Sequence, residues 1–342
     1  MTDKLRVAVV LAAGMGERLK AVGKTIPKGF LCLGKRSIIE ESIDNLQLAG
    51  IERIVIVTGH HFEYYERLKD SYCGIIETVH NPLFAQSGSM YSLYLAKDLL
   101  REDFLLLESD IVYEARAISK LLQFPADNAV LLSGPTYSGD EVYVFTKGKK
   151  IVGMSKDPDK FNGYRAGELV GITKVSRRLF KEMIIEAEAQ FGRTLQVAYE
   201  TDCLSTVSAR FPLYHCLIPD LIWSEIDTPS DLRYTQDTIY PTINKQVQVA
   251  AEVKNLPPGQ QLARISHQSS AAADEMLAVT GCTPSSRFDD VVSTTTAPTS
   301  SPRSPSPSPR HLDTLATNAG EKIGLVPHDS DYTFESGNGN NL

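Results

Sequence analysis

The sequence predicts an α/β protein in which a mostly parallel sheet is flanked by helices and followed by a disordered tail. Residues 1–244 alternate short, β-branched apolar runs with longer stretches whose apolar residues recur at helical spacing, which is typical of βαβ units. From residue 283 to 309, 19 of 27 residues are Ser, Thr or Pro, a composition that cannot bury enough apolar surface to offset chain entropy. We therefore expect one folded domain over residues 1–244 and a low-complexity, disordered tail over residues 245–342.

The first half of the predicted domain alternates regularly. Short apolar runs predict strands at residues 6–12, 53–58, 75–80, 104–108 and 129–133. The amphipathic stretches between them predict helices at residues 37–49, 61–71, 88–100 and 114–123.

The second half begins with a change of pattern. Between residues 141 and 172, short strands and turns follow one another closely, which indicates a small β-rich hairpin inserted over the sheet to receive a second substrate. Helical spacing returns at 176–190 and 199–209, strands are expected at 212–218 and 221–225, and a last helix from about 229 to 238.

Composition excludes several classes of protein. The formal net charge of −7 argues against non-specific nucleic-acid binding, so an anionic ligand would need a local basic site or metal ions. No run of 18 apolar residues occurs, which argues against a membrane span, and the N-terminus lacks a signal-peptide pattern. The five cysteines form no CxxC pair, as expected for reduced thiols. We expect a cytoplasmic protein.

A glycine-rich loop is the most informative motif. The segment Leu11-Ala-Ala-Gly-Met-Gly-Glu-Arg18 lies between a predicted strand and a helix, where a parallel sheet receives phosphates. Gly14 and Gly16 would let the backbone approach a triphosphate, and the helix start favours negative charge. Arg18 and Lys28 would add positive charge where pyrophosphate leaves. No Gly-Lys-Ser/Thr follows, so this is not a P-loop.

At these residues the chain resembles the nucleotidyltransferases that make sugar- and alcohol-phosphate nucleotides. It is most similar to the small cytidylyltransferases acting on phosphocholine or 2-aminoethylphosphonate. The resemblance covers residues 5–240 and implies a Rossmann-like nucleotidyltransferase fold, CTP as the nucleotide and phosphate neutralisation by Lys28. The residues that it implies for holding the nucleotide are Leu11, Ala12, Ala13, Gly14, Met15 and Gly16. One departure is that Ala21-Val-Gly replaces the usual Pro-Leu-Thr after the arginine.

A second match begins at Asn81 and contains Ser87-Gly-Ser89. Members of the family carry a small polar cluster here that touches the nucleotide. In physical terms, Ser87, Gly88 and Ser89 would cap a helix whose first turn presents free N–H donors. The alternative is an ordinary helix cap without a ligand.

Two aspartates predict a magnesium site. Asp110 ends the apolar run that begins at Phe104, and Asp227 follows another predicted strand. The resemblance makes both residues Mg²⁺ ligands, and Mg²⁺ prefers one or two carboxylates with phosphate oxygens and water. Each aspartate taken alone could equally be a helix cap. Glu225 would share a strand face with Asp227 and could join the site, on the acceptor side.

Acceptor-binding residues are expected on the hairpin and on the helix that follows. Lys156 resembles a lysine that contacts the reacting phosphoryl group and would stabilise charge on the α-phosphate, with an exposed hairpin lysine as the alternative. Tyr199, Glu200 and Asp202 are expected on one helix, where a ring and carboxylates would suit an ammonium group. The alternative for these three residues is an ordinary amphipathic helix face.

The sequence therefore favours transfer of CMP from CTP to 2-aminoethylphosphonate, with release of pyrophosphate and no dedicated general base. The scarcity of aromatic anchors favours a primary ammonium over phosphocholine, which is the first alternative, and a sugar 1-phosphate is the second. A catalytically silent nucleotide-binding scaffold is the alternative from another class, although a scaffold has no need for two metal carboxylates. The expected partners are CTP and a small zwitterionic acceptor, without nucleic acid, and a homodimer stays open.

Overall fold

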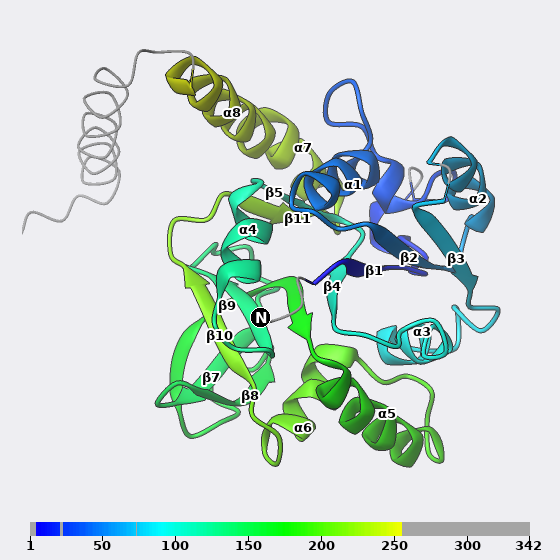
Figure 1. Ribbon diagram of the computed structural model, residues 1–342, viewed down its shortest axis with the longest axis vertical. Helices are drawn as coiled ribbons and strands as arrows, with labels where there is room; N and C mark the ends of the chain where they lie inside the picture. Colours follow the sequence, from blue (N-terminus) through cyan, green and yellow to red (C-terminus); the bar gives the residue numbers. More distant parts are fainter. Residues whose placement is uncertain (1–4, 21–22, 73, 255–342) are drawn as a thin grey trace, which may run out of the picture. The chain divides into compact units, whose positions relative to one another are not determined.

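A nine-stranded sheet forms the centre of the computed structural model, which describes residues 5–20, 23–72 and 74–254 (Figure 1). The strand order is β3-β2-β1-β4-β9-β6-β10-β8-β7. In chain order the strands are β1 Val7–Ala12, β2 Arg53–Thr58, β3 Ile76–His80, β4 Phe104–Glu108, β6 Ala129–Ser133, β7 Tyr143–Lys147, β8 Lys150–Ser155, β9 Tyr164–Val175 and β10 Tyr214–Ile218.

The strands β3, β2, β1 and β4 are parallel, as is the pair β6 and β10, which confirms the predicted α/β class. The long strand β9 lies between β4 and β6 and runs antiparallel to both. The predicted hairpin is formed by β7 and β8, and β7 also pairs with β9. The predicted close-set strands of residues 141–172 are therefore all part of the main sheet, with β7 and β8 at one edge and β9 near its centre, instead of a hairpin inserted over it.

Helices cover both faces of the sheet (Figure 1). One core contains Val7, Val9 and Leu11 of β1, with helices α3 Ser89–Leu95, α5 Arg177–Phe191 and α6 Ser205–Ser208. The other core contains Ala8 and Val10, with α1 Ile38–Leu48, α2 Phe62–Ser71 and α4 Arg116–Gln123. Because both faces of β1 are buried, its sequence is a continuous apolar run instead of an alternating one.

A separate two-stranded sheet joins β5 Ile111–Tyr113 to β11 Trp223–Glu225, which are antiparallel. The sequence predicted a strand at 221–225 but missed β5, which has only three residues. The chain then continues through α7 Pro229–Tyr234, a π-helical segment at 235–239 and α8 Tyr240–Lys254. The predicted domain boundary at 244 falls inside α8, so residues 245–254 of the predicted tail are helical. The rest of the predicted tail, residues 255–342, lies outside the described residues.

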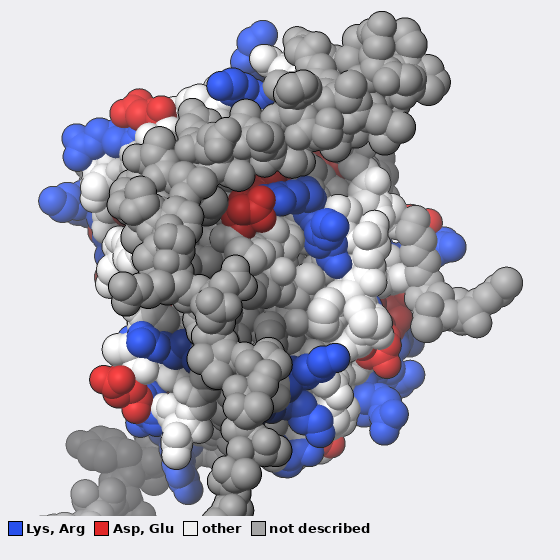
Figure 2. Space-filling view, turned by 90° about the vertical axis from the view of Figure 1, so that its left-hand side faces the viewer, with Lys and Arg blue, Asp and Glu red and all other residues white. Residues whose placement is uncertain are grey.

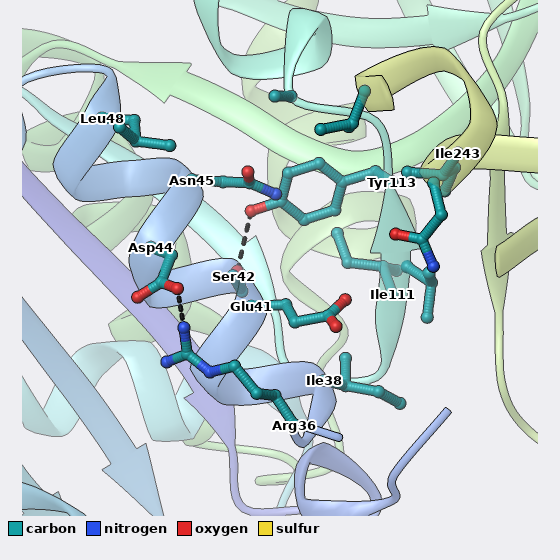
Figure 3. Close-up of a pocket in the computed structure, with 14 residues that line it drawn as sticks. Arg36, Ile38, Glu41, Ser42, Asp44, Asn45, Leu48, Ile111, Tyr113 and Ile243 are labelled. Carbon is teal, nitrogen blue, oxygen red and sulfur yellow. Dashed lines mark hydrogen bonds and ion pairs between the residues drawn. The ribbon is translucent and has the colours of Figure 1, made fainter. Parts of the chain in front are cut away.

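A cavity of about 260 Å³ lies between α1, β5 and α8 (Figure 3). The Ser42 and Tyr113 hydroxyls form a buried hydrogen bond of 2.7 Å across it, and Arg36 pairs with Asp44 at its rim. Its lining contains none of the predicted site residues, so this cavity is separate from the site described below.

On the face shown in Figure 2, Lys and Arg side chains occur in several separate groups with acidic side chains among them. Among residues 5–254 with their two gaps, no helix has the length and apolar character needed to cross a bilayer.

Candidate functional site

The glycine-rich loop leaves β1 at the carboxyl edge of the sheet. The side chains of Leu11, Ala12 and Ala13 are buried, so these residues offer a ligand only their backbone groups. The Ser109 N–H donates to the Leu11 carbonyl at 3.2 Å, which places the loop beside the end of β4. Gly16 has a φ of +64°, in the left-handed region that favours glycine. Residues 14–18 of the loop reach solvent, and a single 3-10 turn at Glu17–Leu19 follows instead of the helix expected there.

Lys28 lies between the two predicted metal aspartates. Its ammonium donates to Asp110 Oδ2 at 2.7 Å and to Asp227 Oδ1, and its side chain is only 14% exposed. Burial lowers the pKa of Lys28, but the charges of Asp110 and Asp227 outweigh burial and raise that pKa above its ordinary value. Lys28 is therefore a fixed positive charge, and it holds the two carboxylates together.

The pairing of β5 with β11 explains why Asp110 and Asp227 meet. Asp110 directly precedes β5, Asp227 follows β11 by one residue, and Ile111 is the register partner of Glu225. The Ile226 N–H also donates to the Asp110 carbonyl at 3.0 Å. The sequence expected both residues at strand ends, and the structure shows that a small sheet outside the main one brings them together.

Arg18 and Lys156 share a partner that the sequence did not reveal. The Arg18 guanidinium contacts Asp140 Oδ2 at 2.8 Å and Asp227 Oδ2 at 2.7 Å. Lys156 donates to the other oxygen of Asp140 at 2.5 Å. All three cations predicted to contact phosphates therefore lie in one connected network with Asp110, Asp227 and Asp140. Asp140 lies in a loop without any motif, so no spacing in the sequence marks it.

Three carboxylates form a second group, which shares Asp110 with this network. Ligand oxygens of Glu108, Asp110 and Glu225 lie within 4.8 Å of one another, and the Tyr199 hydroxyl donates to Glu108 at 2.8 Å. Burial and then neighbouring negative charges raise the pKa values of Glu108 and Glu225. Sequence reasoning missed Glu108, although it stands two residues before Asp110, the same spacing that related Glu225 to Asp227.

This group of carboxylates fits a hard divalent cation. An oxygen-only ligand set of mutually close carboxylates is the kind that Mg²⁺ prefers. The pKa values of Glu108 and Glu225 are raised first by burial and then by neighbouring negative charges, and a bound cation would stabilise the charged forms of both side chains. Asp110 belongs both to this group and to the pair held by Lys28.

The helix cap expected at Ser87–Ser89 is not formed, which corrects the interpretation of that motif. Gly88 is the N-cap of α3 and no side chain caps the helix. The N–H groups of Gly88 and Met90 donate to the carbonyls of Leu195 and Val197, so they are not free for a ligand. Ser87 donates instead to the Leu83 carbonyl, and Ser89 accepts from the Tyr199 N–H. A neighbouring chain segment, absent from any local pattern, takes up these donors.

The predicted helix face with Tyr199 and Asp202 is also wrong. Residues 199–204 form a π-helical turn, in which residues three apart do not share a face. The Tyr199 ring is 1% exposed and packs in the core, and Asp202 accepts a hydrogen bond from the Ala198 N–H. The ring of Tyr199 therefore cannot stack on an ammonium group, and Asp202 stabilises its own turn.

Glu200, from the same turn, differs from both neighbours. Its Oε2 is buried and accepts no hydrogen bond from any described residue. Burial raises the pKa of Glu200, whereas a hydrogen bond from its own backbone N–H, the positive charge of Lys156 and a hydrogen bond with the Ser89 side chain act in the opposite direction. A buried carboxylate oxygen without a donor is costly, so it marks a place where a ligand donor would be stabilised.

Comparison with known proteins gives a family match over most of the domain. The sequence profile described as the MobA-like NTP transferase domain matches residues 8–196. The solved structure of an inositol-1-phosphate CTP transferase from T. maritima superimposes with a TM-score of 0.61 at 20% identity, covering 72% of this chain and 97% of that one. At that identity the likeness shows a shared fold.

Two curated relatives are similar in sequence. A CMP-5'-(3-aminopropyl)phosphonate synthase from Streptomyces rubellomurinus is 28% identical over 70% of this chain and 40% of its own length. A 2-aminoethylphosphonate cytidylyltransferase from Lancefieldella rimae is 29% identical over 44% of this chain and 60% of its own length. The chain spans about half the length of the curated relatives it matches first, with shares of 40%, 54% and 51%.

Proposed function

The chain belongs to the family of MobA-like NTP transferase domains, and from that premise we propose that it transfers CMP from CTP to 2-aminoethylphosphonate and releases pyrophosphate. The observation that carries the proposal is a connected network of charges beside the glycine-rich loop. It joins Arg18, Lys28 and Lys156 to Asp110 and Asp227, with Lys156 connected through Asp140. Positive groups beside a glycine loop suit a triphosphate, and paired carboxylates suit its magnesium ion.

The reaction requires positioning and charge neutralisation. A phosphonate oxygen of the acceptor attacks the α-phosphorus of CTP, a new P–O bond forms, and the bond to the bridging oxygen of the β-phosphate breaks as pyrophosphate leaves. The attacking oxygen is already anionic near neutral pH, so no proton has to be removed. Arg18 and Lys156 are exposed enough to follow the phosphates, and Lys28 supplies a fixed charge.

Magnesium is the cofactor that this site would take. Asp110 and Asp227, with Glu108 and Glu225 beside them, are the residues that would hold it. The ion would neutralise charge on the phosphates during transfer.

The acceptor assignment is supported by Glu200. A primary ammonium donates up to three hydrogen bonds, and the buried Oε2 of Glu200 is an acceptor without a donor. A quaternary ammonium donates none and is held best by aromatic faces, whereas the Tyr199 ring is packed in the core. The names of both phosphonate relatives also refer to an aminoalkyl phosphonate.

Phosphocholine is the second candidate acceptor, and a sugar 1-phosphate is the third. A silent nucleotide-binding scaffold is disfavoured because the protein keeps a group of mutually close carboxylates that binding alone does not require. A cytoplasmic location and a homodimer stay predictions.

Pyrophosphate release from the full chain tests the proposal. CTP, ATP, GTP and UTP are each combined with 2-aminoethylphosphonate, phosphocholine and glucose 1-phosphate in the presence of Mg²⁺. We expect release only with CTP and 2-aminoethylphosphonate. Preferred release with phosphocholine overturns the acceptor assignment, and no release from any pair overturns the proposed reaction.

A matched pair of variants tests the acceptor site. Glu200→Gln removes the charged acceptor and should raise KM for 2-aminoethylphosphonate about tenfold or more while KM for CTP stays unchanged. Asp202→Asn, in the same turn but turned to its own backbone, is the control and should leave both constants unchanged. Equal effects of the two variants would argue against Glu200 as the ammonium partner.

A further inference from the structure

Every cation of the proposed phosphate site already has a carboxylate partner. Lys28 pairs with Asp110 and Asp227, Arg18 with Asp227 and Asp140, and Lys156 with Asp140. The phosphates of a nucleotide require the same guanidinium and ammonium groups. A bound nucleotide would therefore compete with these carboxylates, and the carboxylate that is held least firmly is the one that it would displace.

Burial distinguishes the carboxylate that can leave. Asp110 and Asp227 are 17% and 8% exposed and lie beside the paired strands β5 and β11, which fix their backbone. Asp140 is 40% exposed, and its two partners Arg18 and Lys156 are 56% and 53% exposed. Asp140 is thus the only one of the three whose side chain and partners all face solvent.

The loop that carries Asp140 is anchored to β9 at both ends, since the Leu169 N–H donates to the Val142 carbonyl at 2.9 Å after Asp140. The Thr136 N–H donates to the buried Glu168 at 2.9 Å, which anchors the start of the loop to β9. Between this anchor and Asp140, Tyr137 has a φ of +57° and is 88% exposed, and Gly139 has a φ of +87°. A short turn with left-handed residues can change conformation without disturbing the sheet behind it.

We propose that Asp140 is a removable counter-ion: it holds Arg18 and Lys156 in the unliganded protein and is displaced when the phosphates of the nucleotide bind. Asp140 is therefore a positioning residue that acts through the two cations, and its release couples occupancy of the phosphate site to movement of residues 137–140. The inference rests on the proposed function, because it requires that Arg18 and Lys156 receive phosphates.

Removal of the competing charge tests the inference. In the full chain, Asp140→Asn and Asp140→Ala should lower the dissociation constant for Mg²⁺-CTP, measured by titration calorimetry without acceptor, by about threefold to tenfold, as expected for two half-exposed ion pairs. Inorganic tripolyphosphate, which has no base, should show the same gain. Asp157→Asn is the control: it removes an equal charge beside Lys156, but its carboxylate accepts from the Asp159 N–H instead of from either cation.

The outcomes separate the two proposals. Tighter binding of CTP and tripolyphosphate by both Asp140 variants, with Asp157→Asn unchanged, supports the inference. Unchanged or weaker binding by the Asp140 variants, while the unmodified chain binds CTP, overturns it and leaves the proposed function intact. An equal gain from Asp157→Asn also overturns it, because the effect is then one of general charge. Failure of the unmodified chain to bind any nucleotide overturns the proposed function itself.

Discussion

Replacement of Lys28 by Met is the sharpest test of how the site is held together. The substitution keeps an unbranched side chain, one heavy atom shorter, but removes the ammonium between Asp110 and Asp227, two carboxylates that are 17% and 8% exposed. Breaking a buried ion pair by removing one partner typically costs 3–5 kcal/mol, because a buried charge stays unpaired. Arg18 still contacts Asp227 in the variant, so we expect the lower end, about 3 kcal/mol of unfolding free energy.

The pH dependence of this loss has a defined sign. The folded pKa of Lys28 lies above its ordinary value, so its contribution to stability is fully present at neutral pH and is lost only as the pH rises through that folded pKa. The difference between the unmodified chain and Lys28→Met should therefore be large at pH 7.

Urea unfolding of the full chain measures the effect, and the single tryptophan, Trp223 in β11, reports on this region by fluorescence. Lys35→Met is the control, since Lys35 is exposed and should change stability by less than about 0.5 kcal/mol. Adding Asp110→Asn to Lys28→Met should recover part of the loss, because one unpaired charge is then gone. Equal stabilities of Lys28→Met and Lys35→Met would refute the assignment of Lys28 as the partner of the buried carboxylates.

Three further predictions concern the same edge of the sheet. Gly171→Ala should destabilise the protein by about 1–3 kcal/mol and slow pyrophosphate release, because Gly171 has a φ of +81° and a Cβ there would lie 2.9 Å from Glu108 Oε2. Circular dichroism melting and steady-state assays measure the two effects, and an unchanged melting temperature would contradict the prediction. Glu225→Gln should stabilise the metal-free protein more at pH 8 than at pH 5, by about 1 kcal/mol or more, because burial and neighbouring charges raise the folded pKa of Glu225 and stability then falls as the pH rises towards that pKa. Urea titrations in EDTA at both pH values measure the difference, and equal shifts would refute the raised pKa. Chelation of divalent ions should abolish pyrophosphate release, and added Mg²⁺ should restore it; release that persists in EDTA would argue against the metal role of Asp110 and Asp227.

The local sequence pattern predicted correctly those features that depend on one short segment of the chain. The strand before the glycine-rich loop, Gly14 and Gly16, and the aspartates after the apolar runs all occur where the pattern predicted them. The pattern failed where a distant segment competes for the same groups. The carbonyls of Leu195 and Val197 take the N–H donors expected at the start of α3, and a π-helical turn replaces the helix expected at Tyr199.

The sequence by itself determined the fold class, because the spacing of apolar residues specifies which faces of helices and strands are buried. It also determined which residue types supply positive charge and which supply oxygen ligands, and the resemblance followed from those short motifs. Only the tertiary structure decided which charges become partners. The pairing of β5 with β11 brings Asp110 to Asp227, and a loop without any motif places Asp140 between Arg18 and Lys156. Contacts between residues far apart in the chain depend on the packing of whole elements, and no local periodicity encodes them.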